Sequence, residues 1–200
     1  MNNDIFTVII MFLIVIIVYK RFNVETLTIQ DPKTKISYEI SEDYPDYKKA
    51  YENMKELNQY VIKVIKSIKT ERDNGFDFDD KKYFIDNLLK RYNPDVLIEN
   101  EPNNSDTSYV MNKGDSLHIC LRDKEGKLHD SNILRFVVLH EITHIGSKEP
   151  QHGREFWTNF KWLLHFLENH QLYKPVDYSK KPTIYCGLKL ANNPYFMDFN

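Results

Sequence analysis

The most apolar stretch of the chain lies near its N-terminus, where residues 5–19 read IFTVIIMFLIVIIVY with Thr7 as the only polar side chain. As a helix this stretch would be about 22 Å long, so its flanks would have to complete a membrane crossing of roughly 30 Å. Lys20 and Arg21 follow the stretch, whereas a cleaved signal peptide carries its positive charge in front. We therefore expect an uncleaved single-pass membrane anchor over residues 1–22, with the C-terminal domain cytoplasmic. A buried core helix is the alternative.

The pattern then changes from continuous hydrophobicity to alternation. Between residues 24 and 40, apolar and polar positions alternate around a turn at 31–34, which predicts a hairpin or stalk over 23–43. Apolar residues next recur at spacings of three and four, which predicts an amphipathic helix over 45–69 and a second helix over 79–92.

Short strands are expected after the two helices. Residues 96–99, 109–112 and 117–122 have strand composition and are separated by turn signals, and one more strand is expected around 183–188.

Two further helices lie between these strands and the last one. Asp130 is a suitable N-cap for a helix over 131–145 that Gly146 would close, and an apolar face marks another helix over 153–170. The pattern therefore predicts an α+β domain over residues 44–200.

Composition narrows the functional classes. The 200 residues hold 27 Lys and Arg against 29 Asp and Glu, a net charge of −2, so the chain lacks the basic field that favours nucleic acid. The cysteines are Cys120 and Cys186, which can build neither a disulfide scaffold nor a zinc ribbon. A reducing compartment is the simpler interpretation, and one bridge between them stays open.

Candidate chemistry sits in the apolar helix over 131–145. His140, Glu141 and His144 interrupt its apolar positions and would be costly to bury without partners. Residues four apart share a helical face, so the two imidazoles can bind one zinc ion. Glu141 lies beside them, where its carboxylate could activate a metal-bound water as general base.

A third metal ligand is available downstream. His152 follows His144 by eight residues, and three protein ligands plus a water make an open catalytic zinc site. Glu168 is the competing third ligand. Tyr185 or Tyr178 could supply a phenol to a developing oxyanion, although both could equally be packing residues.

The motif of residues 140–144 followed by His152 and an aromatic pair resembles the WLM and SprT-like branch of zincin metallopeptidases. This resemblance implies a zincin-like metallopeptidase fold with its core motif in residues 131–170, and a protein or peptide substrate. Such enzymes act on proteins crosslinked to DNA or carrying ubiquitin-like tags, but this chain shows no basic DNA-binding appendage. The overall layout also resembles uncharacterised membrane-anchored candidate peptidases of large DNA viruses.

These observations lead to one main hypothesis and two alternatives. The main hypothesis is a membrane-anchored zinc metallopeptidase. The alternatives are a catalytically inactive binding module with a structural metal, and a zinc hydrolase of a non-peptide bond.

The remaining chemistry-bearing residues are expected to be structural. Phe156 and Trp157 are expected to pack beneath the site, and Glu155 to support it or lie exposed. Solvent-facing positions are expected for His118, His129, His165 and His170. The sequence Asn103-Asn104-Ser105 is a glycosylation pattern that would report on topology.

Overall fold

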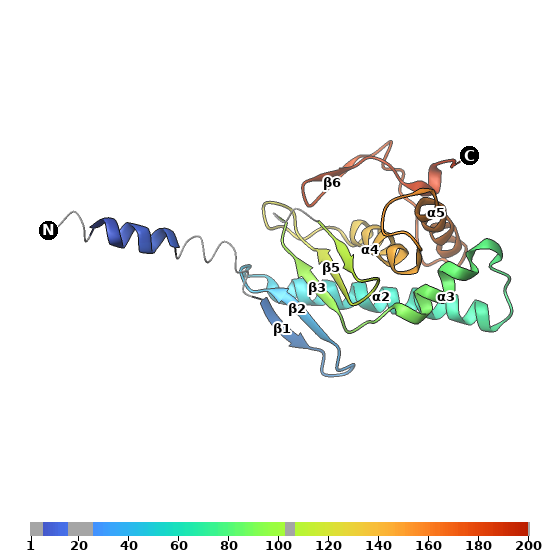
Figure 1. Ribbon diagram of the computed structural model, residues 1–200, viewed down its shortest axis with the longest axis horizontal. Coiled ribbons are helices and arrows are strands. Elements are labelled where there is room, and N and C mark those ends of the chain that lie inside the picture. The colour runs from blue at the N-terminus through green and yellow to red at the C-terminus, as the bar shows by residue number, and fades with distance from the viewer. Residues whose placement is uncertain (1–5, 16–25, 103–106, 200) are drawn as a thin grey trace.

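The computed structural model describes residues 6–15, 26–102 and 107–199 of the chain (Figure 1). The strands are β1 (Thr26–Gln30), β2 (Ser37–Ser41), β3 (Leu97–Asn100), β4 (Tyr109–Met111), β5 (Ser116–Cys120), β6 (Thr183–Tyr185) and β7 (Leu188–Leu190). The longer helices are α2 (Tyr47–Asp73), α3 (Lys82–Arg91), α4 (Ser131–Gly146) and α5 (Arg154–Asn169). Single 3₁₀ turns lie at Asp79–Lys81 and Pro194–Phe196.

Within the described residues the strands form a five-stranded sheet of order β1-β2-β3-β5-β4 and a separate β6-β7 hairpin. The three middle strands β2, β3 and β5 run parallel, and the two outer strands are antiparallel to their neighbours. Strand residues such as Ile40, Leu97 and Ile119 are buried, whereas their neighbours Glu39, Ile98 and His118 are only half-buried. The sheet therefore has one face against the core and one more open face, as is common where helices cover a single side.

The helices complete the core on the buried face of the sheet. The long helix α2 passes behind the strands in Figure 1 and contacts β2 and β3. Helix α4 lies at the centre of the molecule, because it packs against α2, α3, α5 and β4. This position explains why α4 is apolar on nearly every side, and it makes α4 the most constrained place in the fold for polar groups.

The sequence pattern located these elements well. The expected helices over 45–69 and 131–145 correspond to α2 and α4, and the side chain of Asp130 caps α4 by accepting from the Asn132 backbone N–H at 2.8 Å. Gly146 does not close the helix as a left-handed cap but is its last residue. A Cβ there would lie 2.5 Å from the Phe84 ring, so close packing of α3 on α4 requires the glycine.

The expected hairpin after the N-terminal segment is formed by β1 and β2. It is an edge of the main sheet and not a separate stalk, because β2 pairs in parallel with β3. The expected strand around 183–188 is in fact the β6-β7 hairpin, which turns at Cys186 and Gly187, both with positive φ. The mixed α+β architecture is thus as expected.

The membrane anchor is a wrong prediction. Residues 6–15, the described part of this stretch, form an exposed helix. In the part of the chain that the structure describes, no helix combines the length and hydrophobicity that a membrane crossing requires. The prediction of a single-pass protein with a cytoplasmic domain depended on that anchor and is therefore also wrong. The rest of the expected anchor, residues 1–5 and 16–22, and the glycosylation pattern at Asn103 lie outside the described residues.

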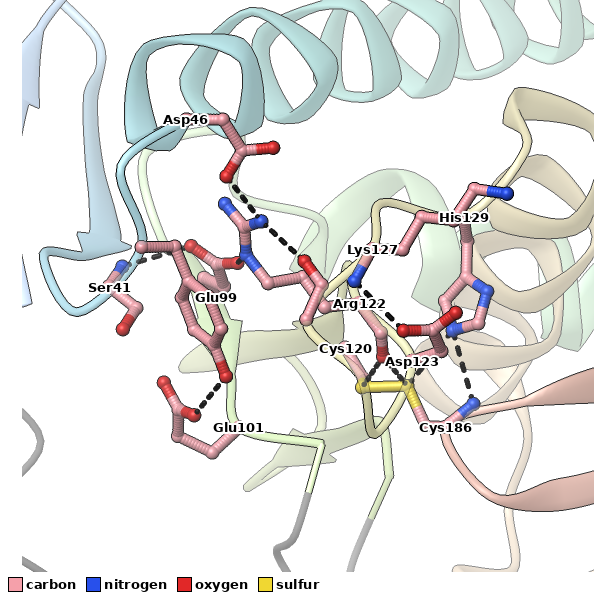
Figure 2. Close-up of polar contacts among 12 residues, drawn as sticks. Ser41, Asp46, Glu99, Glu101, Cys120, Arg122, Asp123, Lys127, His129 and Cys186 are labelled. Carbon is pink, nitrogen blue, oxygen red and sulfur yellow. Dashed lines mark hydrogen bonds and ion pairs between the residues drawn. A yellow bond between two sulfur atoms is a disulfide. The ribbon is translucent and has the colours of Figure 1, made fainter.

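A buried polar cluster ties the parts of the sheet together (Figure 2). Arg122 follows β5, and its guanidinium donates to Glu99 of β3 at 2.9 Å and to Asp46 before α2 at 2.6 Å. The second Glu99 oxygen accepts from the Ser41 backbone N–H at 2.9 Å. The side chains of Arg122 and Glu99 are each 1% exposed, so removal of one would leave the other buried without its ionic partner.

Cys120 and Cys186 form a disulfide next to this cluster (Figure 2). The bridge that the sequence left open is therefore present, and it joins the end of β5 to the turn of the β6-β7 hairpin. The backbone N–H of Cys186 also donates to His129 Nε2 at 3.1 Å, which gives the hairpin a second attachment.

Candidate metal centre

Helix α4 and the loop after it bring three histidine side chains to one point. His140 and His144 lie one helical turn apart on α4, and His152 is in the loop that leads into α5. The Nε2 atom of His152 lies 2.8 Å from Nε2 of His140 and 3.0 Å from Nε2 of His144. Each imidazole offers one ligand atom, and these atoms all lie within 4.8 Å of one another.

This arrangement fits a tetrahedral metal ion. Two nitrogens bound at about 2.1 Å to a tetrahedral ion lie about 3.4 Å apart. The two Nε2–Nε2 distances to His152 would therefore have to lengthen only slightly to admit the ion. Hydrogen bonding among the rings is a poor substitute, because Nε2 of His152 can donate to only one of the other two nitrogens. The three imidazoles could therefore hold a metal ion.

Electrostatics keep the imidazoles in the form that binds metals. Burial lowers the pKa of His140 well below its usual value, with smaller contributions from His144 and His152. Burial lowers the pKa of His144 to about 4, aided by the charges of His152 and Lys113. Burial also lowers the pKa of His152. All three rings are then neutral near pH 7, as ligation requires.

Glu141 lies beside the histidines and is 5% exposed. Burial raises the pKa of its carboxyl group to about 8. A carboxyl group with such a pKa can accept and return protons near neutral pH, which is the property of a general base. A nearby dication would favour its ionised form.

The four residues open into a shared pocket of about 420 Å³. His140, Glu141, His144 and His152 form one side of it. Strand β4, the residue before it and the turn after it form another side of the pocket. The lining residues on this side are Ser108, Tyr109, Val110, Asn112 and Lys113, and Pro150 also lines the pocket. The candidate metal ligands therefore face a cavity that a terminal strand of the sheet borders.

Aromatic rings support the histidines from below. The ring of Phe156 stacks on His144 with centroids 4.2 Å apart, and the ring of Trp157 stacks on His152 at 5.5 Å. Both aromatic residues pack beneath the site, as the sequence predicts. Glu155 supports the same loop, since its carboxylate accepts from the backbone N–H of Lys148 at 3.2 Å.

The competing third ligand is directed elsewhere. Glu168 accepts a hydrogen bond from the hydroxyl of Tyr195 and is not part of the histidine group. The structure therefore brings His152, and not Glu168, to the pair on α4.

The two tyrosines considered as oxyanion donors are buried in the core. The Tyr185 hydroxyl donates to the Cys120 carbonyl at 2.8 Å and lies 2.6 Å from Ser108 Oγ, which itself accepts from the Cys120 N–H. The single hydroxyl hydrogen of Tyr185 is thus already engaged. Tyr178 packs on Phe136 at 5.1 Å. Neither tyrosine lines the pocket.

The remaining four histidines are half-buried and do not line the metal pocket. His118 is half-buried and stacks on Tyr109 at 4.3 Å, so it is less exposed than expected. His129 is also half-buried, and it accepts from the Cys186 N–H. His165 stacks on Tyr195 at 4.0 Å, and His170 lies 3.3 Å from the Glu71 carboxylate.

Comparison with known proteins finds relatives in viruses. Uncharacterized protein R325 of Acanthamoeba polyphaga mimivirus is 35% identical over 118 residues, 58% of this chain and 60% of that protein. Uncharacterized protein 042R of Invertebrate iridescent virus 3 is 37% identical over 105 residues, 51% of this chain and 60% of that protein. Uncharacterized protein 136R of Invertebrate iridescent virus 6 is 31% identical over 96 residues, 46% and 53% of the two chains. The expected similarity to uncharacterised viral proteins is confirmed, and the chain spans at most 60% of the length of these relatives.

Other comparisons give no classification. No family model matches the chain, and no solved structure matches it. The expected zincin-like fold behind a transmembrane helix is therefore corrected to a mixed α+β fold without that helix among the described residues.

Proposed function

We propose that this protein is a zinc-dependent peptidase in which His140, His144 and His152 bind the metal and Glu141 is the general base. The observation that carries the proposal is the convergence of three imidazoles beside a buried carboxyl group in one pocket. The motif formed by residues 140–144 and His152 also resembles that of the WLM and SprT-like metallopeptidases.

The chemistry follows from the residues that surround the pocket. Zinc, when bound, lowers the pKa of a water molecule toward 7 and polarises a carbonyl group. Glu141 takes the proton from the attacking water and returns it to the leaving amine. Burial raises the pKa of Glu141 in the metal-free site, and a bound dication would favour the carboxylate that accepts the proton.

The sheet supplies a way to bind an extended peptide. β4 is the terminal strand in the described sheet and borders the same pocket as the histidines. An extended chain that adds to this strand would place a backbone carbonyl next to the metal centre. A peptide bond is for this reason our preferred substrate over other hydrolysable bonds.

The test uses zinc-loaded protein and a fluorescently labelled unfolded protein as substrate. Glu141→Gln is expected to keep its zinc and to lower the turnover by roughly 10²–10⁴-fold, the usual contribution of a general base. Glu56→Gln is the matched control, since Glu56 is exposed on α2 outside the metal pocket, and it should cleave as wild type does.

Two outcomes would contradict the proposal. Unchanged turnover in Glu141→Gln would remove Glu141 as the base. Zinc-loaded wild type that cleaves no unfolded protein or peptide would remove the peptidase activity and leave a metal-binding module or a hydrolase of another bond.

A further inference from the structure

The side chain of Lys113 holds the end of the metal-binding helix and the loop after it. Its Nζ donates to the carbonyl of His144 at 3.2 Å, to that of Ser147 at 2.9 Å and to that of Glu149 at 3.0 Å. An ammonium group has three N–H donors, and these contacts use all of them. One acceptor belongs to a candidate metal ligand, and the other two lie in the segment that leads to His152.

The turn between β4 and β5 adopts a demanding backbone conformation to place this side chain. Asn112, Lys113 and Gly114 have φ values of 44°, 62° and 126°, so two non-glycine residues lie in the left-handed region. A Cβ at position 114 would come within 2.8 Å of the Arg91 carbonyl oxygen, so the turn lies directly against α3. Left-handed non-glycine residues are costly and persist where the surrounding structure fixes them.

Capping of the helix end does not by itself explain these contacts. Arg91 donates to the carbonyl of Ile145 at 3.3 Å and so already covers part of the C-terminus of α4. Lys113 differs from Arg91 because it reaches past the helix to Ser147 and Glu149. The extra contacts restrain the loop that carries His152.

This restraint matters because His152 is the most weakly held of the three imidazoles. His140 and His144 are fixed by a buried helix, whereas His152 is an exposed loop residue. A ligand on a mobile loop must be ordered when it binds the metal, and the entropy lost in that step weakens binding. A loop that is already fixed avoids that loss.

We infer that Lys113 is a positioning residue that sets metal affinity by fixing the loop that carries His152. The inference rests on the proposed metal centre and adds to it a residue that does not bind the metal. Lys113 lies in the turn after β4, the strand proposed to bind the peptide. Its contacts therefore connect that strand to the loop that carries His152.

The test measures zinc affinity by competition with a chromophoric chelator and needs no catalytic activity. Lys113→Met is expected to weaken zinc binding by roughly 10–100-fold, the range found when groups that orient metal ligands are removed. Arg91→Met, which removes a contact to the same helix end but none to the loop, should change the affinity far less. Lys113→Arg keeps donors at this position and should recover most of the affinity.

A double-mutant cycle with His152→Ala separates positioning from general stabilisation. If Lys113 acts through His152, Lys113→Met should have almost no further effect on zinc affinity once His152 is absent. The visible spectrum of the cobalt(II)-loaded proteins gives a second readout, since loss of an ordered imidazole changes the ligand field. If Lys113→Met does not fold, Lys113→Gln takes its place in the same cycle.

The outcomes distinguish this inference from the proposed function. Wild-type zinc affinity in Lys113→Met would overturn the role of Lys113 and leave the metal centre intact. Equal losses with and without His152, or an equal loss in Arg91→Met, would also overturn it, because the effect would then be on the helix as a whole. A wild-type protein that binds no zinc would instead remove the proposed function itself.

Discussion

Reduction of the Cys120–Cys186 disulfide is expected to destabilise the folded chain strongly. The two residues are 66 apart in sequence, so the bridge closes a long loop in the unfolded chain. The chain-entropy relation for a loop of this length gives about 4 kcal/mol of stabilisation at 25 °C. Free energies of unfolding are typically about 5–15 kcal/mol, so this one bond accounts for a large share.

Hydrogen bonds also hold the β6-β7 hairpin to the body of the protein. Tyr185 bonds to Cys120 and Ser108, and the N–H of Cys186 bonds to His129. These hydrogen bonds survive in the reduced protein if the thiols stay in place, so the entropic contribution should account for most of the loss.

Urea unfolding with and without a phosphine reductant measures the effect. A urea m value of about 2 kcal/mol/M converts a loss of about 4 kcal/mol into a midpoint lower by about 2 M. Both sulfurs are buried, so reduction proceeds through the unfolded chain and the samples must reach equilibrium. The double variant Cys120→Ser/Cys186→Ser should show the low midpoint and no response to reductant.

An unchanged midpoint, in protein whose thiols have been titrated as free, would refute this reasoning. It would mean that the hairpin contacts or a compact unfolded state compensate for the bond.

The other two stability predictions concern buried charge. Arg122→Met should lower the free energy of unfolding, measured in urea, by about 3–5 kcal/mol because it removes the ionic partner of the buried Glu99 carboxyl group. Arg72→Met removes only surface pairs and should lower it by less than about 1 kcal/mol. Similar losses in the two variants would contradict the importance of burial. Hydrogen bonds from Lys55 and the backbone hold the pKa of Asp31 below its usual value, so ionised Asp31 stabilises the fold above about pH 4 and this contribution is lost as the pH falls through the folded-state pKa. Melting temperatures of wild type and Asp31→Asn should therefore converge toward acid pH, and a constant difference would contradict this.

Local patterns in the sequence were sufficient for most of the helices and for the ligands on α4. Spacings of three and four residues located α2, and a pair of histidines four apart must share a helical face wherever that helix packs. His152 was also accessible as a candidate third ligand, with Glu168 as its competitor, because a short loop after α4 limits how far the chain can travel.

Features that depend on packing between distant segments were not accessible in the same way. Asn112, Lys113 and Gly114 indicate a turn, but nothing local shows that the lysine reaches the end of α4. The Cα atoms of Cys120 and Cys186 are 6.4 Å apart only because the hairpin folds back onto β5. Tyr185 was a reasonable donor by residue type, yet its hydroxyl is engaged with Cys120.

The anchor was mispredicted for a different reason. The hydrophobicity of residues 5–19 and the basic residues after them suggested a membrane span, although the stretch needed its flanks to reach the length of a crossing. Among the described residues, no helix meets both requirements, hydrophobicity and length.

The measurement that tests the central claim most directly is the zinc content of purified protein after loading with Zn²⁺ and removal of excess metal. Wild type should retain about one zinc ion per chain, and His140→Ala/His144→Ala should retain only background. The control His118→Ala/His165→Ala removes two imidazoles outside the site and should match wild type. Equal zinc content in wild type and in the variant that lacks His140 and His144 would contradict the account.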